Sequence, residues 1–476
     1  MRRWTHIRIG AVATGCLVAW LAVCAIAQVV VEPEAPAADP EPPVEIADVV
    51  IAPVEEPEVE AMVMVDVESP IVAEGVEVRW VKQLSAEQLD ERSIVAMLPA
   101  EEGFYLLLGR DMKLEAFRFD EAGQEQWRRE LPPEFSGSGA FLTYNEAGNL
   151  LVAGTAETPL VPTAGAVLNK VYIAELDAEG VILSEEKFSL PFILPTVFAE
   201  QLGVELEVTD IVWTPEGDAF IAGALWGQMG SKVQAVPFLA RVDDRGEAYW
   251  SQLVAPDVPH LTSVDDAAFR EVISEDTILL AGSTRASLDG ASQGGTDLFA
   301  VAYSNAGDMA WGKQYGSDGD DDLVAAYGDA DGFTFMGTTS GDLADRCVGR
   351  SDGFILHCDS AGAWDWGVQS GERASDAYRT LLIADGVTRA ASAVDGDLQL
   401  AEYDEVGDQT WTKSLVMDGL FIPTRVSPRA DGTLLGWGRY FPAAGDDEYY
   451  DPETVIFCLE PSWSLPPEEP DEATDD

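Results

Sequence analysis

The sequence predicts an all-β protein in which seven similar sheets close into a ring. Three observations lead to this prediction: a motif that recurs about every 57 residues, four short apolar runs within each recurrence, and an offset between the first and last runs. No segment after residue 27 keeps a helical apolar period over three turns. Self-similarity of this kind indicates a repeat array rather than several unrelated domains.

The clearest part of the motif reads Asp-x-x-Gly-x-x-x-Trp. Its first position holds Asp120, Asp177, Asp243, Ser304, Asp359 and Asp404, and its last position holds Trp127, Ser184, Trp250, Trp311, Trp366 and Trp411. We expect the aspartate to accept hydrogen bonds from turn amides and the glycine to adopt a positive φ. The tryptophan is expected to pack between neighbouring sheets. Gly75 and Trp80 form an incomplete seventh copy.

Each recurrence contains four apolar runs that are separated by tight turns, which is typical of antiparallel strands. The series begins with an outer run at 77–84 and ends with a third run at 454–460. In a ring, the first strand completes the last sheet. The sequence therefore predicts a seven-bladed β-propeller of four-stranded antiparallel blades over residues 75–460, closed by pairing strand 77–84 with the C-terminal blade.

The fifth repeat carries the most specific likeness to a known family. The stretches at 311–321, 331–333 and 351–356 read WGKQYGSDGDD, DGF and SDGFIL. They resemble the bacterial SBBP-type propeller repeat, and the likeness extends over about 75–460. This resemblance implies an exported bacterial protein, commonly of the cell surface or envelope, and it supplies no catalytic residues. The quinone-type propeller, whose repeats also end in Gly-x-x-x-Trp, is the nearest alternative.

Residues 1–27 are predicted to be a signal peptide. Arg2, Arg3 and Arg8 precede an uncharged stretch that ends in Ala25-Ile26-Ala27, so cleavage would leave Gln28 first. The alternatives are an uncleaved membrane anchor and a lipoprotein, because residues 21–24 resemble a lipobox. Each alternative gives an exported protein that is periplasmic, at the cell surface or secreted.

Two further segments are predicted to be disordered. Residues 28–74 form an acidic, Pro-rich linker, with 13 acidic residues, eight prolines and no lysine or arginine between 29 and 74. Residues 461–476 form an acidic tail with four prolines and six acidic residues.

The charge of the chain limits its partners. It contains 85 acidic and 28 basic residues, for a formal net charge of −57. Such a surface repels phosphate backbones and anionic lipids, so we expect no nucleic-acid partner. Contact with a membrane is expected only through the N-terminal segment, if that segment is uncleaved or lipidated. The expected state is a monomer that binds another envelope or extracellular protein.

The predicted binding surface is the ring face that carries the long connections, since function on rigid scaffolds concentrates in loops. These connections include 225–237 and 439–453. The candidate contact residues are the aromatic residues Trp226, Tyr440, Tyr449 and Tyr450. Packing within the fold is the alternative role for each of them.

Calcium is the one cofactor that the sequence leaves open. Asp318, Asp320 and Asp322 have the 1-3-5 spacing of calcium loops, although Leu323 stands where such loops place glycine. The alternative is that these acids cap a turn. The sequence also leaves open whether Cys347 and Cys358 form a disulfide.

No catalytic residue is predicted. After the signal peptide only His260 and His357 remain, and neither a zinc motif nor Gly-x-Ser-x-Gly occurs. The expected function is therefore a non-enzymatic protein-interaction or structural module. Two alternatives remain: a propeller enzyme that acts on saccharides through paired carboxylates, and a quinone-type propeller or assembly scaffold.

Overall fold

The computed structural model describes residues 62, 64–66, 71–72, 76–84, 89, 92–110, 113–132, 140–145, 147–156, 166–194, 203–214, 217–229, 232–243, 245–254, 270–274, 277–288, 292–328, 332–371, 377–384, 387–394, 397–417, 419–429, 431–442 and 453–461. The predicted signal peptide, the linker up to residue 61 and the tail from residue 462 lie outside these residues. The chain divides into two units, 1–59 and 60–476, and every described residue belongs to the second.

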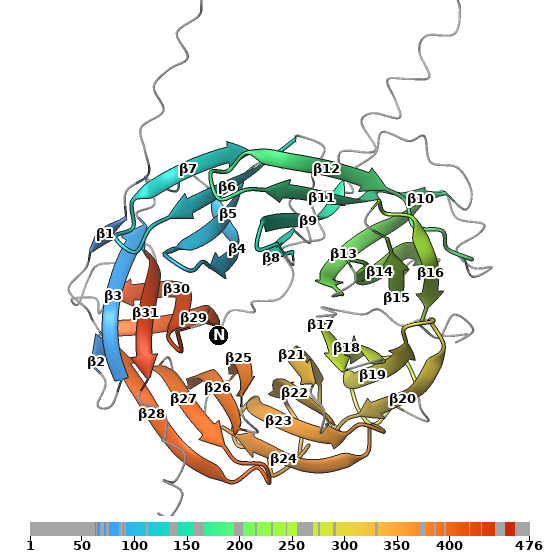
Figure 1. Cartoon of the computed structure of the whole chain (residues 1–476). Coiled ribbons are helices and arrows are strands. Elements are labelled where there is room, and N and C mark those ends of the chain that lie inside the picture. Colours follow the sequence, from blue (N-terminus) through green and yellow to red (C-terminus); the bar gives the residue numbers. More distant parts are fainter. Residues whose placement is uncertain are drawn as a thin grey trace, which may run out of the picture. The chain divides into compact units, whose positions relative to one another are not determined.

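The second unit is a ring of seven antiparallel blades, which confirms the predicted fold (Figure 1). Blades 1 to 3 consist of β4 (Ser93–Pro99), β5 (Phe104–Arg110), β6 (Lys113–Phe119) and β7 (Glu125–Glu130); β8 (Phe141–Tyr144), β9 (Leu150–Ala156), β11 (Lys170–Leu176) and β12 (Ile182–Phe188); and β13 (Val204–Trp213), β14 (Ala219–Met229), β15 (Lys232–Val242) and β16 (Ala248–Leu253). The short strand β10 (Val167–Leu168) adds to β13 in parallel.

Blades 4 to 7 follow in chain order. They consist of β17 (Arg270–Ser274), β18 (Thr277–Thr284), β19 (Asp297–Ser304) and β20 (Met309–Tyr315); β21 (Asp321–Gly328), β22 (Gly332–Thr339), β23 (Asp352–Asp359) and β24 (Trp364–Ser370); β25 (Ala377–Ala384), β26 (Val387–Val394), β27 (Asp397–Tyr403) and β28 (Gln409–Met417); and β29 (Gly419–Pro428), β30 (Leu434–Pro442), β31 (Glu453–Pro461) and β3 (Val76–Leu84). The first strand of each blade lies nearest the centre of the ring (Figure 1). Within the described residues, no helix has the length and apolarity needed to cross a membrane.

The ring closes as predicted. Strand β3 pairs antiparallel with β31, from Val76 opposite Pro461 to Leu84 opposite Thr454. Blade 7 therefore takes three strands from the C-terminal part of the chain and its outer strand from the N-terminal part. Pro461, the first residue of the predicted tail, belongs to β31.

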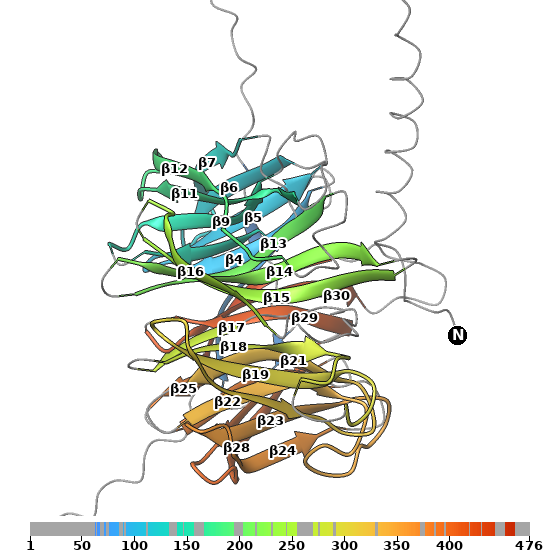
Figure 2. The ribbon, with the colours of Figure 1, turned by 90° about the vertical axis from the view of Figure 1, so that its right-hand side faces the viewer.

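Apolar side chains between the blades hold the ring together. The described residues form seven buried clusters, and each cluster joins one blade to the next. Figure 2 shows the ring from the side, where the sheets of neighbouring blades, such as β13–β16 and β17–β20, lie next to each other. The cluster between blades 7 and 1 includes Leu84, Phe104, Leu435 and Ile456, all at most 1% exposed. The core is thus not one central cluster but a ring of sheet-to-sheet contacts, as expected when each blade buries both faces against neighbours.

The Asp-x-x-Gly turns have the predicted geometry. In blade 2, Asp177 Oδ1 accepts hydrogen bonds from the backbone N–H groups of Glu179 and Val181, at 3.0 and 2.8 Å. Gly180 has a φ of 76°, a conformation that glycine adopts without the clash a Cβ would cause. The turns at Asp243, Asp359 and Asp404 repeat this pattern.

The motif tryptophans connect each blade to the following one. Trp127 on β7 of blade 1 lies against Gly180 of blade 2, and its Nε1–H donates to the carbonyl oxygen of Ala178 at 2.8 Å. The same donation joins Trp250 to Asn305 and Trp311 to Ser360. The tryptophan therefore packs on the turn glycine of the next blade and bonds to its turn carbonyl.

Substituting turn glycines should show separately how much the positive φ and the contact with the tryptophan ring contribute to the free energy of unfolding. A Cβ on Gly180 would lie 2.5 Å from the Trp127 ring, whereas a Cβ on Gly148 (φ 80°) meets nothing within 4 Å. We expect Gly148→Ala to cost about 1 kcal/mol of unfolding free energy because of its positive φ. Gly180→Ala should cost a further 1–3 kcal/mol or so because of overpacking. Urea unfolding of both variants measures the difference, and equal losses would contradict the packing role of Trp127.

The last part of the predicted linker is attached to the propeller. Strand β1 (Val65–Asp66) pairs with β3 of blade 7, and β2 (Ile71–Val72) pairs with β28 of blade 6. The backbone N–H of Met64 donates to Gly123 O of blade 1 at 3.1 Å. We call residues 62, 64–66 and 71–72 the strap.

The strap differs from the disordered linker predicted for 28–74, and it makes the propeller begin before residue 75. The outer strand of a blade has unpaired N–H and C=O groups, which a passing segment can satisfy. The side chains of Met62 and Met64 are 6% and 3% exposed and belong to the cluster between blades 7 and 1. The alternation of apolar residues in this segment was visible in the sequence, but its partner strands were not.

Removing the apolar contact of the strap should weaken the ring. We expect Met64→Asp to lower the free energy of unfolding by about 2–4 kcal/mol, because the contact is lost and a charge is buried. Met309→Asp is the matched control, since Met309 is 65% exposed on β20. Denaturant unfolding compares the two variants, and the same small effect in both would contradict the docking of the strap.

Candidate functional site

The structure describes two of the four predicted aromatic residues, Trp226 and Tyr440, and they belong to different blades. Trp226 lies in β14 of blade 3, paired with Ala235, and Tyr440 lies in β30 of blade 7. Both side chains are partly buried against apolar clusters, which is the packing role. Tyr449 and Tyr450 lie outside the described residues.

The predicted connection 225–237 is mostly strand rather than loop. Strand β14 continues to Met229 and β15 begins at Lys232, and these two residues are paired. The glycines and polar residues in this stretch suggested a loop, but an extended hairpin satisfies its backbone groups equally well.

The three calcium candidates are not brought together as a ligand set. Asp320 Oδ1 accepts the backbone N–H of Thr296 at 3.0 Å, which links the start of blade 5 to blade 4. The neighbouring Asp321 is buried and accepts the N–H of Ser317 at 2.6 Å, so acids cap this connection. No group of three His, Cys, Asp or Glu side chains arranged for a metal occurs in the described part of the chain, Asp318 and Asp322 included.

Cys347 and Cys358 are both free. Cys358 lies near the end of β23, whereas Cys347 precedes the start of that strand at Asp352. Burial raises the pKa of Cys358 to about 12, which keeps its thiol protonated.

The histidine that the structure describes also has a packing role. His357 stacks on Trp366 with ring centroids 5.4 Å apart and planes 8° from parallel. His260 lies outside the described residues.

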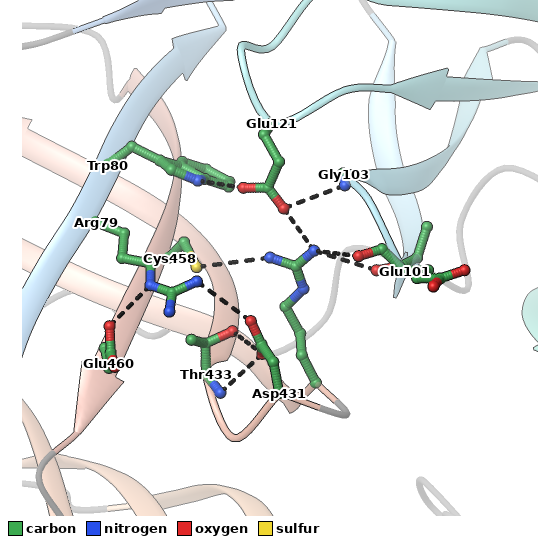
Figure 3. Close-up of polar contacts among 11 residues, drawn as sticks. Arg79, Trp80, Glu101, Gly103, Glu121, Asp431, Thr433, Cys458 and Glu460 are labelled. Atoms are coloured by element: carbon green, nitrogen blue, oxygen red, sulfur yellow. Dashed lines mark hydrogen bonds and ion pairs between the residues drawn. The ribbon is translucent and has the colours of Figure 1, made fainter.

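A cluster of polar side chains lies where blade 7 meets blade 1 (Figure 3). Arg429 follows β29, and its side chain is 5% exposed. Its Nη2 lies 2.5 Å from Glu121 Oε1, which belongs to the turn between β6 and β7. The same nitrogen donates to the carbonyl oxygens of Ala100 and Glu101, at 3.2 and 3.3 Å. One guanidinium therefore holds two turns of blade 1 to a turn of blade 7.

Glu121 accepts hydrogen bonds from both blade 7 and blade 1. Trp80 on β3 donates its Nε1–H to Oε2 at 2.9 Å, and the backbone N–H of Gly103 donates to Oε1 at 3.2 Å. Residue 121 occupies the turn position whose backbone carbonyl accepts the tryptophan in other blades. Here its side chain does so instead.

A second arginine reinforces the joint between the two ends of the chain. Arg79 on β3 donates to Glu460 on β31 at 2.9 Å and to Asp431 at 3.2 Å (Figure 3). Asp431 also accepts hydrogen bonds from the N–H and the hydroxyl of Thr433. The side chains of these pairs are about half exposed, so each pair contributes little to the free energy of folding by itself. Together they fix the geometry of the joint.

A cavity of about 700 Å³ lies beside this cluster and extends over blades 7, 1 and 2. Its lining includes Arg118 and Arg429, the rings of Tyr105 and Tyr144, and Asp431. Arg118 donates to Ala178 O at 2.9 Å, and its guanidinium lies 5.6 Å from the centre of the Tyr105 ring. Tyr144 donates its hydroxyl to Pro99 O at 2.6 Å.

The lining of this cavity combines both signs of charge with aromatic rings. Its charged side chains are Arg118, Arg429, Glu101 and Asp431, and Arg429 is paired with Glu121. Burial raises the pKa of Tyr105 and of Tyr144, so both phenols stay neutral. Arg118 is held by the Ala178 carbonyl and the Tyr105 ring, so it is the cation of this lining that remains to interact with a bound group.

Sequence reasoning did not identify Arg429 and Glu121, which are more than 300 residues apart. One signal was present: Arg429-x-x-Gly432 is the turn between the first two strands of its blade, where blade 2 has Asn145 and blade 3 has Thr214. An arginine at a position that other blades fill with small polar residues is an anomaly in a chain with few basic residues.

The sequence matches no protein-family model. It also matches no curated protein. Solved structures with similar folds include the polysaccharide lyase Uly1 (9% identity, 77% of this chain and 89% of that one, TM-score 0.44) and the WD40 domain of Toxoplasma gondii coronin (8%, 84% and 89%, 0.43). The β-propeller domain of the Trilobed protease from Pyrococcus furiosus is another (11%, 73% and 89%, 0.40). At these identities and scores, the likenesses carry no information about substrate or partner.

The charge of Glu121 should contribute to stability in a pH-dependent way. Burial raises the pKa of this carboxyl, but hydrogen bonds from Arg429, Trp80 and Gly103 outweigh it, and the net pKa lies below the ordinary 4.5. A lowered folded-state pKa stabilises the fold above the unfolded-state pKa, and this stability is lost as the pH falls through the folded-state value.

We expect Glu121→Gln to lose about 1 kcal/mol at pH 7, a low value for a charged hydrogen bond because 43% of the side chain is exposed. The difference from wild type should shrink below about pH 4.5, where the wild-type carboxyl becomes protonated. Urea unfolding at pH 7 and at about pH 3.5 measures this difference in stability. Glu102→Gln is the control, because the Glu102 side chain is exposed. A deficit that stays constant with pH would contradict the ionic role.

Proposed function

We propose that this protein is an exported, non-enzymatic β-propeller that acts as a protein-interaction or structural module of the cell envelope or surface. The observation that carries the proposal is the cavity beside the closure joint, with Arg118, Arg429, Tyr105 and Tyr144 in its lining. Three blades contribute to it, and backbone carbonyls hold both arginines in place. A preformed surface of this kind loses little side-chain conformational entropy when it binds a partner.

The cavity suits a segment of another envelope or extracellular protein that carries a carboxylate. A guanidinium has five N–H donors in a planar fork, and the bond to Ala178 uses one donor of Arg118. The chain as a whole has a net charge of −57, so a guanidinium in a cavity, such as that of Arg118, is the kind of group that an acidic segment would approach.

Export and repeat type complete the proposal. The charged start, uncharged stretch and Ala-Ile-Ala ending of residues 1–27 support export, and the acidic linker up to residue 61 supports a spacer between the propeller and its point of attachment. The residues at 311–321 and 351–356 support assignment to the bacterial SBBP-type repeat. N-terminal sequencing of the natural protein should find Gln28 first if the signal peptide is cleaved.

A charge reversal in the cavity tests the interaction. The mature chain is used to capture partners from an envelope extract, with Arg118→Glu and Arg350→Glu as variants of equal charge change. Arg350 is exposed in the connection between β22 and β23 of blade 5. We expect Arg118→Glu to reduce the amount of captured partner by about tenfold or more, because the substitution replaces attraction with repulsion. Arg350→Glu should capture as much partner as the wild type does. Equal capture by both variants, or turnover of saccharides by the mature chain, would contradict the proposal.

A further inference from the structure

The junction between blades 2 and 3 lacks the tryptophan that fills the other junctions. Ser184 on β12 pairs with Glu175, the register in which Trp127 pairs with Arg118 and Trp250 pairs with Arg241. The structure therefore places a hydroxyl where four other junctions place an indole ring against the next turn glycine, as Trp127, Trp250, Trp311 and Trp366 do.

A cavity remains at this place. It has a volume of about 310 Å³, and its lining includes Ser184, Ile173, Phe188, Trp213 and Gly246. The ring of Phe188 lies against Gly246 and covers the turn, but it does not fill the remaining space. The apolar walls of this cavity, which include Phe188 and Trp213, suit a flat aromatic ring.

The charged residues in the lining indicate which charge a bound molecule should carry. Among the described residues, the ionisable side chains that line this cavity are Glu175, Glu186 and Asp243, all of them acidic. Glu175 Oε1 accepts hydrogen bonds from Asn145 and Asn149, so its carboxylate is held in a fixed orientation. Its Oε2 accepts from the Ser184 hydroxyl at 3.3 Å, at the point where the missing ring would begin.

From these features we propose that the cavity between blades 2 and 3 binds a small molecule with a flat aromatic ring and an alkylammonium group. The ring occupies the space that remains between the two blades beside Phe188 and Trp213, and the ammonium lies beside Glu175 and Glu186. This site is separate from the arginine-lined cavity at the joint of blades 7 and 1, and it does not depend on the function proposed there.

Three matched probes test the ring and the charge separately: tryptamine, indole-3-ethanol and indole-3-acetate, each titrated into the mature chain by calorimetry. We expect tryptamine to bind one to one and about tenfold or more tighter than the neutral probe, and indole-3-acetate to bind weakest, because like charges repel. Equal affinity for the three probes, or no binding of tryptamine at about 1 mM, would overturn the proposal.

Two variants locate the site. Ser184→Trp places a large side chain in the cavity, so it should abolish tryptamine binding. Glu186→Gln keeps the cavity and should weaken tryptamine several-fold without changing indole-3-ethanol. Glu185→Gln is the matched control, because Glu185 accepts the Tyr172 hydroxyl and does not line the cavity. If Glu186→Gln binds tryptamine as wild type does, or if a folded Ser184→Trp still binds it, the site is not the one proposed.

Discussion

The pairing of β3 with β31 is the constraint on which the rest of this structure depends. In the first six blades the third and fourth strands follow each other in the sequence and share an Asp-x-x-Gly turn or its serine counterpart. In blade 7 no covalent turn joins them, because one strand starts at Val76 and the other ends at Pro461. The contacts from Arg79 to Glu460 and Asp431 lie where that turn would be, so side-chain pairs replace the missing connection.

The neighbouring features follow from the same constraint. An open joint would let blades 7 and 1 separate, and the contacts that cross it come from three directions. Arg429 holds the inner turns, Trp80 bonds to Glu121 from the outer strand, and Met64 of the strap covers the outside. The cavity proposed for partner binding lies beside these contacts, and the contacts hold the turns that line it in place.

The sequence predicted what local physics determines and missed what long-range geometry determines. The turn aspartates, the positive-φ glycines and the tryptophans act within a few residues or on the next blade, and their spacing alone identified the blades and the closing strand. Ser304 shows why one departure was harmless, since its hydroxyl still accepts the N–H of Asp308 at 3.2 Å. The contact of Arg429 with Glu121 and the partners of the strap carry no such period, so no local pattern could reveal them.

Ser184 is a departure of the opposite kind. A serine can replace an aspartate in a turn because both have an oxygen at the required position, but a serine cannot replace the volume of an indole ring. The loss is not absorbed by collapse, because β12 stays in register with β11 and the two blade faces are held apart by their own packing. A repeat protein therefore acquires a cavity wherever one copy loses its spacer residue while its neighbours keep the ring at fixed dimensions.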